Sequence, residues 1–353
     1  MNRMMKRILL LAGLVAVVAT SAAFTAKHGV SYSWHVTPTG TTAHFRGLSA
    51  VSDNVAWVSG YTPTNGVVLR TTDGGTTWQS VGPPGAAGLQ FRDIEAFDAD
   101  HAVILSIGDN ATDFRVYVTS DGGVHWTQTF TNAEPTAFYD CMTFFDRQHG
   151  LAVSDPVNGK FRLISTSDGG SSWQIVSPDG MPPALPGEAG FAASGECLTS
   201  HGNRAWFGSG GGAQARVFSS KDGGQTWQAS ATPIPSGPTS GVNGIAFHDA
   251  RHGIAVGGDF SAPKASPNAV AITSDGGTTW LTAKAPSEYR SGVDWLRGQT
   301  AIDVGLSGSD YSTDGGSTWT TFDTGSFDTV DCVHTTCWAS GAGGRVGYLV
   351  QSK

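Results

Sequence analysis

The stretch Thr71-Thr72-Asp73-Gly74-Gly75-Thr76-Thr77-Trp78 is the first of six copies of the pattern Ser/Thr-x-Asp-x-Gly-x-x-Trp in a chain of 353 residues. No copy departs from the pattern. The copies occupy residues 71–78, 119–126, 166–173, 220–227, 273–280 and 312–319, and their aspartates are Asp73, Asp121, Asp168, Asp222, Asp275 and Asp314. Successive aspartates are 48, 47, 54, 53 and 39 residues apart. This spacing is typical of one four-stranded propeller blade.

The chemistry of the repeated box indicates a structural role. Asp-Gly-Gly favours a tight hairpin turn with positive φ at glycine. The carboxylate and the preceding hydroxyl can hydrogen-bond to the turn's own backbone, and the Trp can pack between neighbouring blades. The alternative is that these aspartates bind calcium or act as catalytic acids. A feature repeated six times around a rim is more often part of the scaffold.

The strands around the boxes predict an all-β, seven-bladed β-propeller. Seven inner-strand candidates begin near Phe45, Phe91, Tyr139, Phe191, Val242, Gly292 and Phe327. The last group of strands, which begins near Phe327, has no box after it. The segment Tyr32–Val36 resembles the strand that follows each box, so we expect it to pair with Gly344–Val350. This pairing would complete the last blade and close the ring, which removes exposed strand edges.

The N-terminus reads as an export signal. Arg3, Lys6 and Arg7 precede an apolar run that is followed by small residues, the pattern of a secretory signal peptide. We expect a signal peptide over residues 1–23, with cleavage as late as residue 26, and one propeller domain over residues 24–353. An uncleaved membrane tether is the alternative, although the run is short for a span. The mature protein is expected to be a periplasmic or extracellular monomer without a membrane span.

Composition excludes several classes of partner. The chain has 21 Lys and Arg against 29 Asp and Glu, a formal net charge of −8, and it contains no charge run. Nucleic-acid and anionic-lipid binding normally require clustered basic residues, so neither is expected. No sequence pattern indicates a metal or another cofactor.

Four cysteines remain in a chain predicted to be exported. In an oxidising compartment they can form disulfides. Cys332 and Cys337 are close in sequence and are favoured as a pair, whereas the pairing of Cys141 with Cys197 stays open. Metal binding is the rival interpretation, but no CxxC pair or suitably spaced His supports it.

The repeats resemble the BNR/Asp-box superfamily, and most closely the photosystem II stability/assembly factors. The segment Phe45-Arg46-Gly47-Leu48, the strand from Val55 to Gly60 and the run into Asp73-Gly74-Gly75 look like that family's repeat, and Phe91-Arg92-Asp93-Ile94 repeats it. The resemblance implies an exported propeller that binds and stabilises a protein or a protein–cofactor assembly without catalysis. It does not require a photosynthetic partner, because a fold alone does not transfer function.

Three arginines are candidates for the binding face. Arg46 and Arg92 lie one residue into equivalent inner strands, and Arg290 lies just before the sixth. Together they could hold a carboxylate or an acidic peptide at the channel mouth. The alternative is that each arginine pairs with an acid and holds a blade together.

A glycoside hydrolase or sialidase-like enzyme acting on carbohydrate at the same mouth is the second candidate function. A sialidase would need three arginines and a Tyr–Glu pair, for which Tyr139 or Tyr289 with Glu188 or Glu288 are candidates, but the Arg-Ile-Pro signature of sialidases is absent. An ordinary glycosidase needs two carboxylates about 5–10 Å apart. The candidates for that pair are Glu188, Asp259, Asp155 and Asp140, and Tyr139, Glu188 and Asp259 are also candidates for ligand binding.

Overall fold

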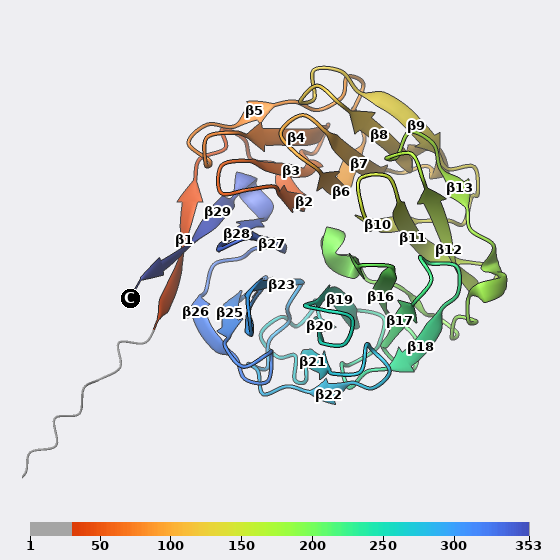
Figure 1. Ribbon diagram of the computed structural model, residues 1–353, viewed down its shortest axis with the longest axis vertical. Coiled ribbons are helices and arrows are strands. Elements are labelled where there is room, and N and C mark those ends of the chain that lie inside the picture. The colour runs from red at the N-terminus through yellow and green to blue at the C-terminus, as the bar shows by residue number, and fades with distance from the viewer. Residues whose placement is uncertain (1–29, 353) are drawn as a thin grey trace, which may run out of the picture.

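The chain is built from short antiparallel strands. The computed structural model describes residues 30–352, which form 29 β-strands and four 3-10 turns and contain no α-helix. Within these residues no helix is long and apolar enough to cross a membrane. The predicted signal peptide lies outside the described residues. Figure 1 shows the sheets following one another in chain order around a common centre.

Five of the sheets hold four strands each. They comprise β2 (His44–Ala50), β3 (Ala56–Tyr61), β4 (Gly66–Thr71) and β5 (Gln79–Ser80); β6 (Gln90–Ala96), β7 (Ala102–Ile107), β8 (Arg115–Thr119) and β9 (Thr127–Thr131); β10 (Tyr139–Phe144), β11 (Gly150–Val157), β12 (Lys160–Thr166) and β13 (Gln174–Ile175); β23 (Gly292–Arg297), β24 (Thr300–Gly305), β25 (Gly308–Ser312) and β26 (Thr320–Asp323); and β27 (Thr329–Val333), β28 (Thr336–Ser340), β29 (Val346–Ser352) and β1 (Ser31–Thr37).

The sixth sheet has nine strands and falls into two parts. The first part holds β14 (Ala189–Gly190), β15 (Leu198–His201), β16 (Arg204–Gly210), β17 (Arg216–Ser220) and β18 (Gln228–Ala231), and the second holds β19 (Ser240–Phe247), β20 (Gly253–Asp259), β21 (Val270–Thr273) and β22 (Leu281–Thr282). One residue pair, Gly210 with Gly241, joins the two parts. The 3-10 turns are η1 (Ala111–Asp113), η2 (Pro178–Gly180), η3 (Gly195–Cys197) and η4 (Ala342–Gly344).

The first strand pairs with the last, as the sequence predicted. All seven residues of β1 pair with β29, from Ser31 opposite Ser352 to Thr37 opposite Val346. The indole of Trp34 packs against Phe327 and donates a 3.0 Å hydrogen bond to the Ser309 hydroxyl in β25. Strand β1 therefore connects its own sheet to the preceding one.

The six box turns share one hydrogen-bond network. In the first box, the Thr71 hydroxyl donates to Asp73 Oδ1 over 2.9 Å and accepts the Gly75 N–H over 2.9 Å. The same carboxylate accepts the Thr77 N–H over 2.9 Å. The two box glycines adopt positive φ in all six copies, which explains why other residues do not occur there. The bonds recur in every copy.

Tryptophans fill the contacts between sheets. Trp57, Trp206 and Trp338 of the second strands are fully buried. The box residue Trp126 packs edge-on against Trp57 of the preceding sheet at 6.4 Å between ring centroids, and Trp78 packs in the same way against Trp338 at 6.0 Å. Aromatic pairs in this geometry add to the stabilisation from burial.

Polar side chains of the innermost strands also link neighbouring sheets. Asp93 in β6 accepts the Met142 N–H of β10 over 2.7 Å, and Asp331 in β27 accepts the Ala50 N–H of β2 over 2.6 Å. Asp294 in β23 accepts the Cys332 N–H of β27 over 2.7 Å. The sequence analysis did not foresee this role for the inner-strand aspartates.

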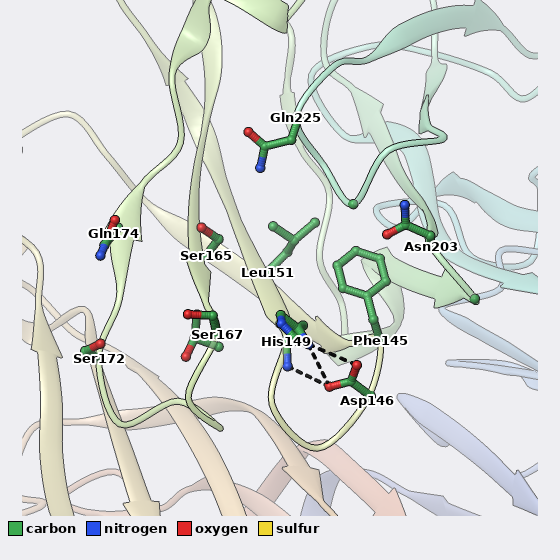
Figure 2. Close-up of a pocket in the computed structure, with 14 residues that line it drawn as sticks. Phe145, Asp146, His149, Leu151, Ser165, Ser167, Ser172, Gln174, Asn203 and Gln225 are labelled. Atoms are coloured by element: carbon green, nitrogen blue, oxygen red, sulfur yellow. Dashed lines mark hydrogen bonds and ion pairs between the residues drawn. The ribbon is translucent and has the colours of Figure 1, made fainter.

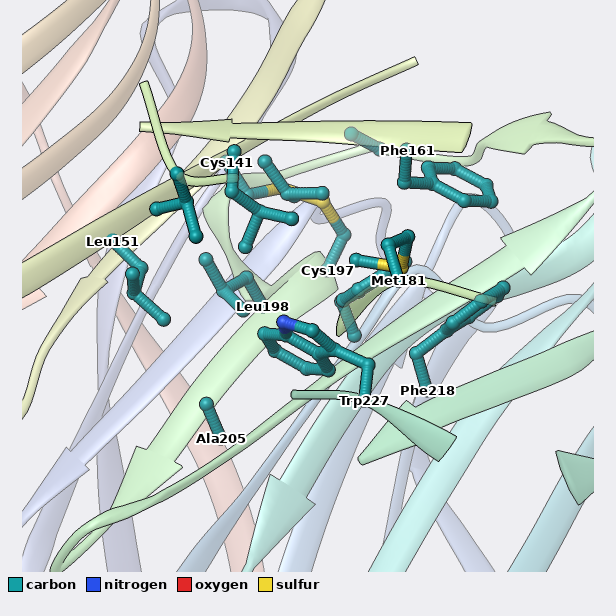
Figure 3. Close-up of a cluster of buried hydrophobic side chains, with 14 residues drawn as sticks. Cys141, Leu151, Phe161, Met181, Cys197, Leu198, Ala205, Phe218 and Trp227 are labelled. Atoms are coloured by element: carbon teal, nitrogen blue, oxygen red, sulfur yellow. A yellow bond between two sulfur atoms is a disulfide. The ribbon is translucent and has the colours of Figure 1, made fainter. Parts of the chain in front are cut away.

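The segment 191–197 departs from the prediction. An inner strand was expected to begin near Phe191, but the inner strand of this sheet, β15, begins at Leu198. Residues 191–197 instead run toward the centre, where η3 lies (Figure 1). A disulfide joins Cys197 of η3 to Cys141 of β10, inside the apolar cluster between the two sheets (Figure 3). A second disulfide joins Cys332 to Cys337 across the β27–β28 hairpin.

Candidate functional site

Four inner strands share the same irregularity near their first residues. The register of the pairing slips by one residue at Arg46 in β2, at Arg92 in β6, at Asp140 in β10 and at Asn243 in β19. Each of these residues is the unpaired extra residue of a β-bulge. Bulges bend the strand and redirect a side chain, and they are common beside functional sites.

A cavity of about 470 Å³ lies at these bulges. Three of the four bulge residues, Arg46, Arg92 and Asn243, line it. Its apolar wall includes Phe191 and Phe260, whose ring centroids lie 6.3 Å apart, and Leu306. Phe260 and Leu306 are 44% and 41% exposed. The cavity therefore combines cationic groups with an open apolar rim, as binding sites commonly do.

The two arginines in this cavity are held by neutral carbonyl groups. Arg46 Nε donates to the Ala193 carbonyl over 2.7 Å, and Arg46 Nη2 donates to the Ala192 carbonyl over 2.6 Å. Arg92 Nη2 donates to the same Ala192 carbonyl. Within residues 30–352 no carboxylate lies within 4 Å of the Arg46 guanidinium, so its charge is oriented without being neutralised.

Burial changes the acid–base properties around Arg92. Burial, and then the nearby Arg46 charge, lower the pKa of Arg92 to about 10. The Asp140 carboxylate lies 3.7 Å from Arg92, and burial raises its pKa to about 8, with the Asp155 charge adding to the rise. Burial also raises the pKa of Asp155, which accepts the Gly190 N–H over 2.7 Å.

Further polar groups line the same cavity. His44 Nε2 lies 2.7 Å from Asp328 Oδ2, and its ring stacks on Tyr61 at 5.6 Å between centroids. Tyr289 is 2% exposed, and burial raises the pKa of its hydroxyl, with the Asp328 charge adding to the rise. The cavity thus offers both donors and acceptors.

The structure corrects the prediction that Arg290 joins Arg46 and Arg92 in a clamp. The Arg290 side chain is 1% exposed, and it pairs with Asp303 at 3.0 Å and with Asp310 at 2.6 Å. A third contact, at 3.3 Å, goes to Glu288. An arginine enclosed by three carboxylates has no free edge for a ligand, so Arg290 holds its own sheet together.

The predicted Tyr139–Glu188 pair is also absent. Tyr139 is fully buried and packs edge-on against Phe130, and burial raises the pKa of its hydroxyl. Glu188 has no exposed side-chain surface and forms a two-point ion pair with Arg216, in which Arg216 Nε donates to Glu188 Oε1 over 2.8 Å. Tyr139 therefore belongs to an apolar cluster and Glu188 to an ion pair, and within residues 30–352 the two side chains make no hydrogen bond to each other.

Asp259 lies beside the cavity rather than in it. Its carboxylate accepts the Ser261 N–H over 2.9 Å and the Ser261 hydroxyl over 2.7 Å. These hydrogen bonds lower the pKa of Asp259, the opposite of what a general acid requires. The next residue, Phe260, is the one that lines the cavity.

Other cavities lie away from Arg46 and Arg92. One of about 640 Å³ is lined by the turn of Asp146 and His149 and by the Thr166–Trp173 box, and Figure 2 shows the contact between Asp146 and His149 at its edge. Another, of about 160 Å³, is lined by Asp93, Glu196 and Asp331 of the inner strands and η3. No group of three or more His, Cys, Asp or Glu within residues 30–352 has a geometry suited to a metal ion.

Asn243 is one of the cavity residues that the sequence analysis missed. The segment Val242-Asn243-Gly244 has the same register as Phe45-Arg46-Gly47, with the bulge at the middle residue of both. Aligning the inner strands on the glycine would have placed Asn243 beside Arg46. Asn243 carries no charge, so the presence of charged side chains at the channel mouth does not indicate it.

No protein-family model and no curated protein matches this sequence. Solved structures do resemble the fold. The structure described as YCF48 bound to D1 peptide has 14% identity and a TM-score of 0.65, and the match covers 90% of this chain and 95% of that one. A GH74 enzyme from Niastella koreensis has 13% identity and a TM-score of 0.55, over 84% of this chain and 50% of that one. The WD40 β-propeller domain of Doa1 has 12% identity and a TM-score of 0.59, over 92% and 98%. At these identities the likeness shows the fold alone, a β-propeller that is found both in binding proteins and in enzymes.

Proposed function

We propose that this protein is an exported β-propeller scaffold that binds an acidic segment of a partner protein at the cavity around Arg46. The observation that carries the proposal is the Arg46 guanidinium, which is oriented by two carbonyl oxygens and lacks a carboxylate partner within the described residues. An oriented and unneutralised guanidinium favours an incoming carboxylate. The likeness to YCF48 bound to D1 peptide supports a peptide as the occupant.

We also propose that the propeller has seven blades of the Asp-box type and is closed by β1. Three observations support this count. The nine-stranded sheet is bridged by a single residue pair, β1 pairs with β29, and every box makes the same bonds. The two disulfides support export to the periplasm or the extracellular space, because such bonds persist in oxidising compartments.

Peptide binding tests the proposal directly. We expect fluorescently labelled acidic peptides to bind, and their affinity to fall as salt is added, because exposed charge–charge attraction is screened. Arg46→Gln should weaken binding at least tenfold. Arg46→Lys should also weaken binding, because a lysine cannot hold the carboxylate of the peptide through two parallel N–H donors. Arg251→Gln, an exposed arginine in the turn between β19 and β20, is the control and should bind as the unmodified protein does. Equal binding by Arg46→Gln would refute the site.

A glycoside hydrolase is the second candidate, favoured by one observation. The carboxylates of Asp140 and Asp155 both lie beside Gly190, which lines the cavity, and the pKa of Asp140, raised to about 8, suits a general acid. The likeness to a GH74 enzyme is consistent with this candidate. Turnover on a panel of polysaccharides that disappears in Asp155→Asn would favour hydrolysis. We expect no turnover.

A further inference from the structure

Asn243 lines the cavity, and its Oδ1 atom is buried without a partner within residues 30–352. Asn243 is 3% exposed and lines the cavity together with Arg46 and Arg92. No residue among 30–352 donates a hydrogen bond to its Oδ1 atom. Buried polar atoms in folded proteins are nearly always hydrogen-bonded, and an exception calls for an explanation.

The fold itself does not require an amide at this position. Asn243 is the extra residue of the β19 bulge, where Arg46 and Arg92 stand in their own strands. Its side chain makes none of the bonds that link the inner strands to one another. A side chain that contributes no internal bond but faces the site is best explained by a bond to a ligand.

The charge of the cavity limits what that ligand can donate. Arg46 and Arg92 are both cationic, and burial together with the Arg46 charge already lowers the pKa of Arg92. A lysine or arginine from the partner would be repelled here. A neutral donor next to an acidic group fits better, and the main chain of a peptide supplies both, a backbone N–H and a neighbouring carboxylate.

We propose that Asn243 is a specificity-determining residue that accepts a hydrogen bond from a backbone N–H of the bound peptide, next to the acidic group held by Arg46. The occupant is then an extended segment that enters with its main chain, while a side chain contacts Phe191 and Phe260 at the rim. This inference rests on the proposed peptide-binding function. It adds that the site recognises the main chain as well as the charge.

A thermodynamic cycle between protein and peptide tests it. The probe is a capped heptapeptide with a central Asp between two Leu, together with versions that carry one N-methyl group at each backbone amide in turn. We expect one N-methylation near the Asp to weaken binding by the unmodified protein at least tenfold. Asn243→Leu should weaken binding of the unmethylated peptide by a similar factor. In Asn243→Leu the same N-methylation should cost less than twofold, because coupled changes are not additive.

Thermal unfolding separates recognition from a structural role. Asn243→Leu replaces an unbonded amide with an apolar group of similar size, so its Tm should equal or exceed that of the unmodified protein. Asn243→Ala gives a second variant for the cycle.

Two results would overturn the inference while leaving acidic-peptide binding intact. One is a lower Tm of Asn243→Leu with unchanged affinity, and the other is an equal loss of affinity on N-methylation for the unmodified protein and for Asn243→Leu. A failure of every acidic peptide to bind would instead overturn the proposed function, and the inference with it. Binding of a neutral oligosaccharide that depends on Asn243 would assign the amide to carbohydrate.

Discussion

At the scale of single residues, the same side chain has different roles at different places in the fold. Arg46 and Arg290 are two of the three arginines of the predicted clamp, yet Arg46 contacts only carbonyl oxygens and Arg290 is enclosed by carboxylates. The difference comes from Asp303 and Asp310, which face Arg290 from adjacent strands. A single sequence shows which acids exist but not which of them face an arginine, so the binding residues could be predicted only in part.

Removing a box carboxylate should weaken the fold without affecting binding. Asp168 accepts the Ser172 N–H over 2.8 Å and the Ser172 hydroxyl over 2.7 Å. Asp168→Ala should lower the free energy of unfolding by about 1–2 kcal/mol, since the bonds are solvent-exposed. Urea unfolding measures the loss. A decrease in peptide affinity at unchanged stability would show that the box is a ligand site instead.

A buried inner-strand aspartate should make stability depend on pH. Burial raises the pKa of Asp331 to about 8, so the folded state favours the protonated form. This contribution to stability is complete below the ordinary pKa of Asp and is lost as the pH rises toward 8. Asp331→Asn keeps an acceptor for the Ala50 N–H and cannot ionise. It should be more stable than the unmodified protein at pH 8.5, by on the order of 1–3 kcal/mol, and show little gain at pH 4. An equal effect at both pH values would contradict this.

At the scale of elements, the regular repeats were predictable and the departures from them were not. The box turns follow from Asp-Gly-Gly, because two successive glycines permit the positive φ of the turn. The segment 191–197 has the same apolar start as an inner strand, at Phe191, but it is held away from the sheet. Arg46, Arg92 and the disulfide to Cys141 fix its path, and all three partners are distant in sequence.

The two disulfides should differ in their effect on stability. Cys141 and Cys197 are 56 residues apart, whereas Cys332 and Cys337 are 5 apart. The entropy lost by the unfolded chain grows with loop length, which gives about 4 kcal/mol for the long loop and about 2 kcal/mol for the short one. Replacing each pair with Ala and measuring urea unfolding compares them. Removal of the Cys141–Cys197 disulfide should also reduce peptide affinity, because Ala192 and Ala193 then lose their fixed position. Removal of the Cys332–Cys337 disulfide should leave binding unchanged.

At the scale of the whole molecule, the repeat predicts the architecture because each sheet needs its neighbours. A four-stranded sheet cannot bury both faces alone, and the tryptophans of one sheet complete the core of the next. The pairing of β1 with β29 was predictable because β29 would otherwise present an unpaired edge. The identity of the ligand was not predictable, because it depends on how three bulges and the segment 191–197 come together at the cavity.

Strand β1 should be essential for the stability of the fold. It supplies the outer strand of the sheet of β27, β28 and β29, and Trp34 reaches Ser309 in the preceding sheet. Deleting residues 30–40 should therefore expose the β29 edge and the apolar surface under Trp34. We expect a large drop in Tm and self-association through the exposed edge, measured by calorimetry and light scattering. Trp34→Phe is the milder control, since it keeps the strand and loses only the indole hydrogen bond, worth about 1 kcal/mol. A shortened chain that remained monomeric with an unchanged Tm would show that the remaining sheets are stable without β1.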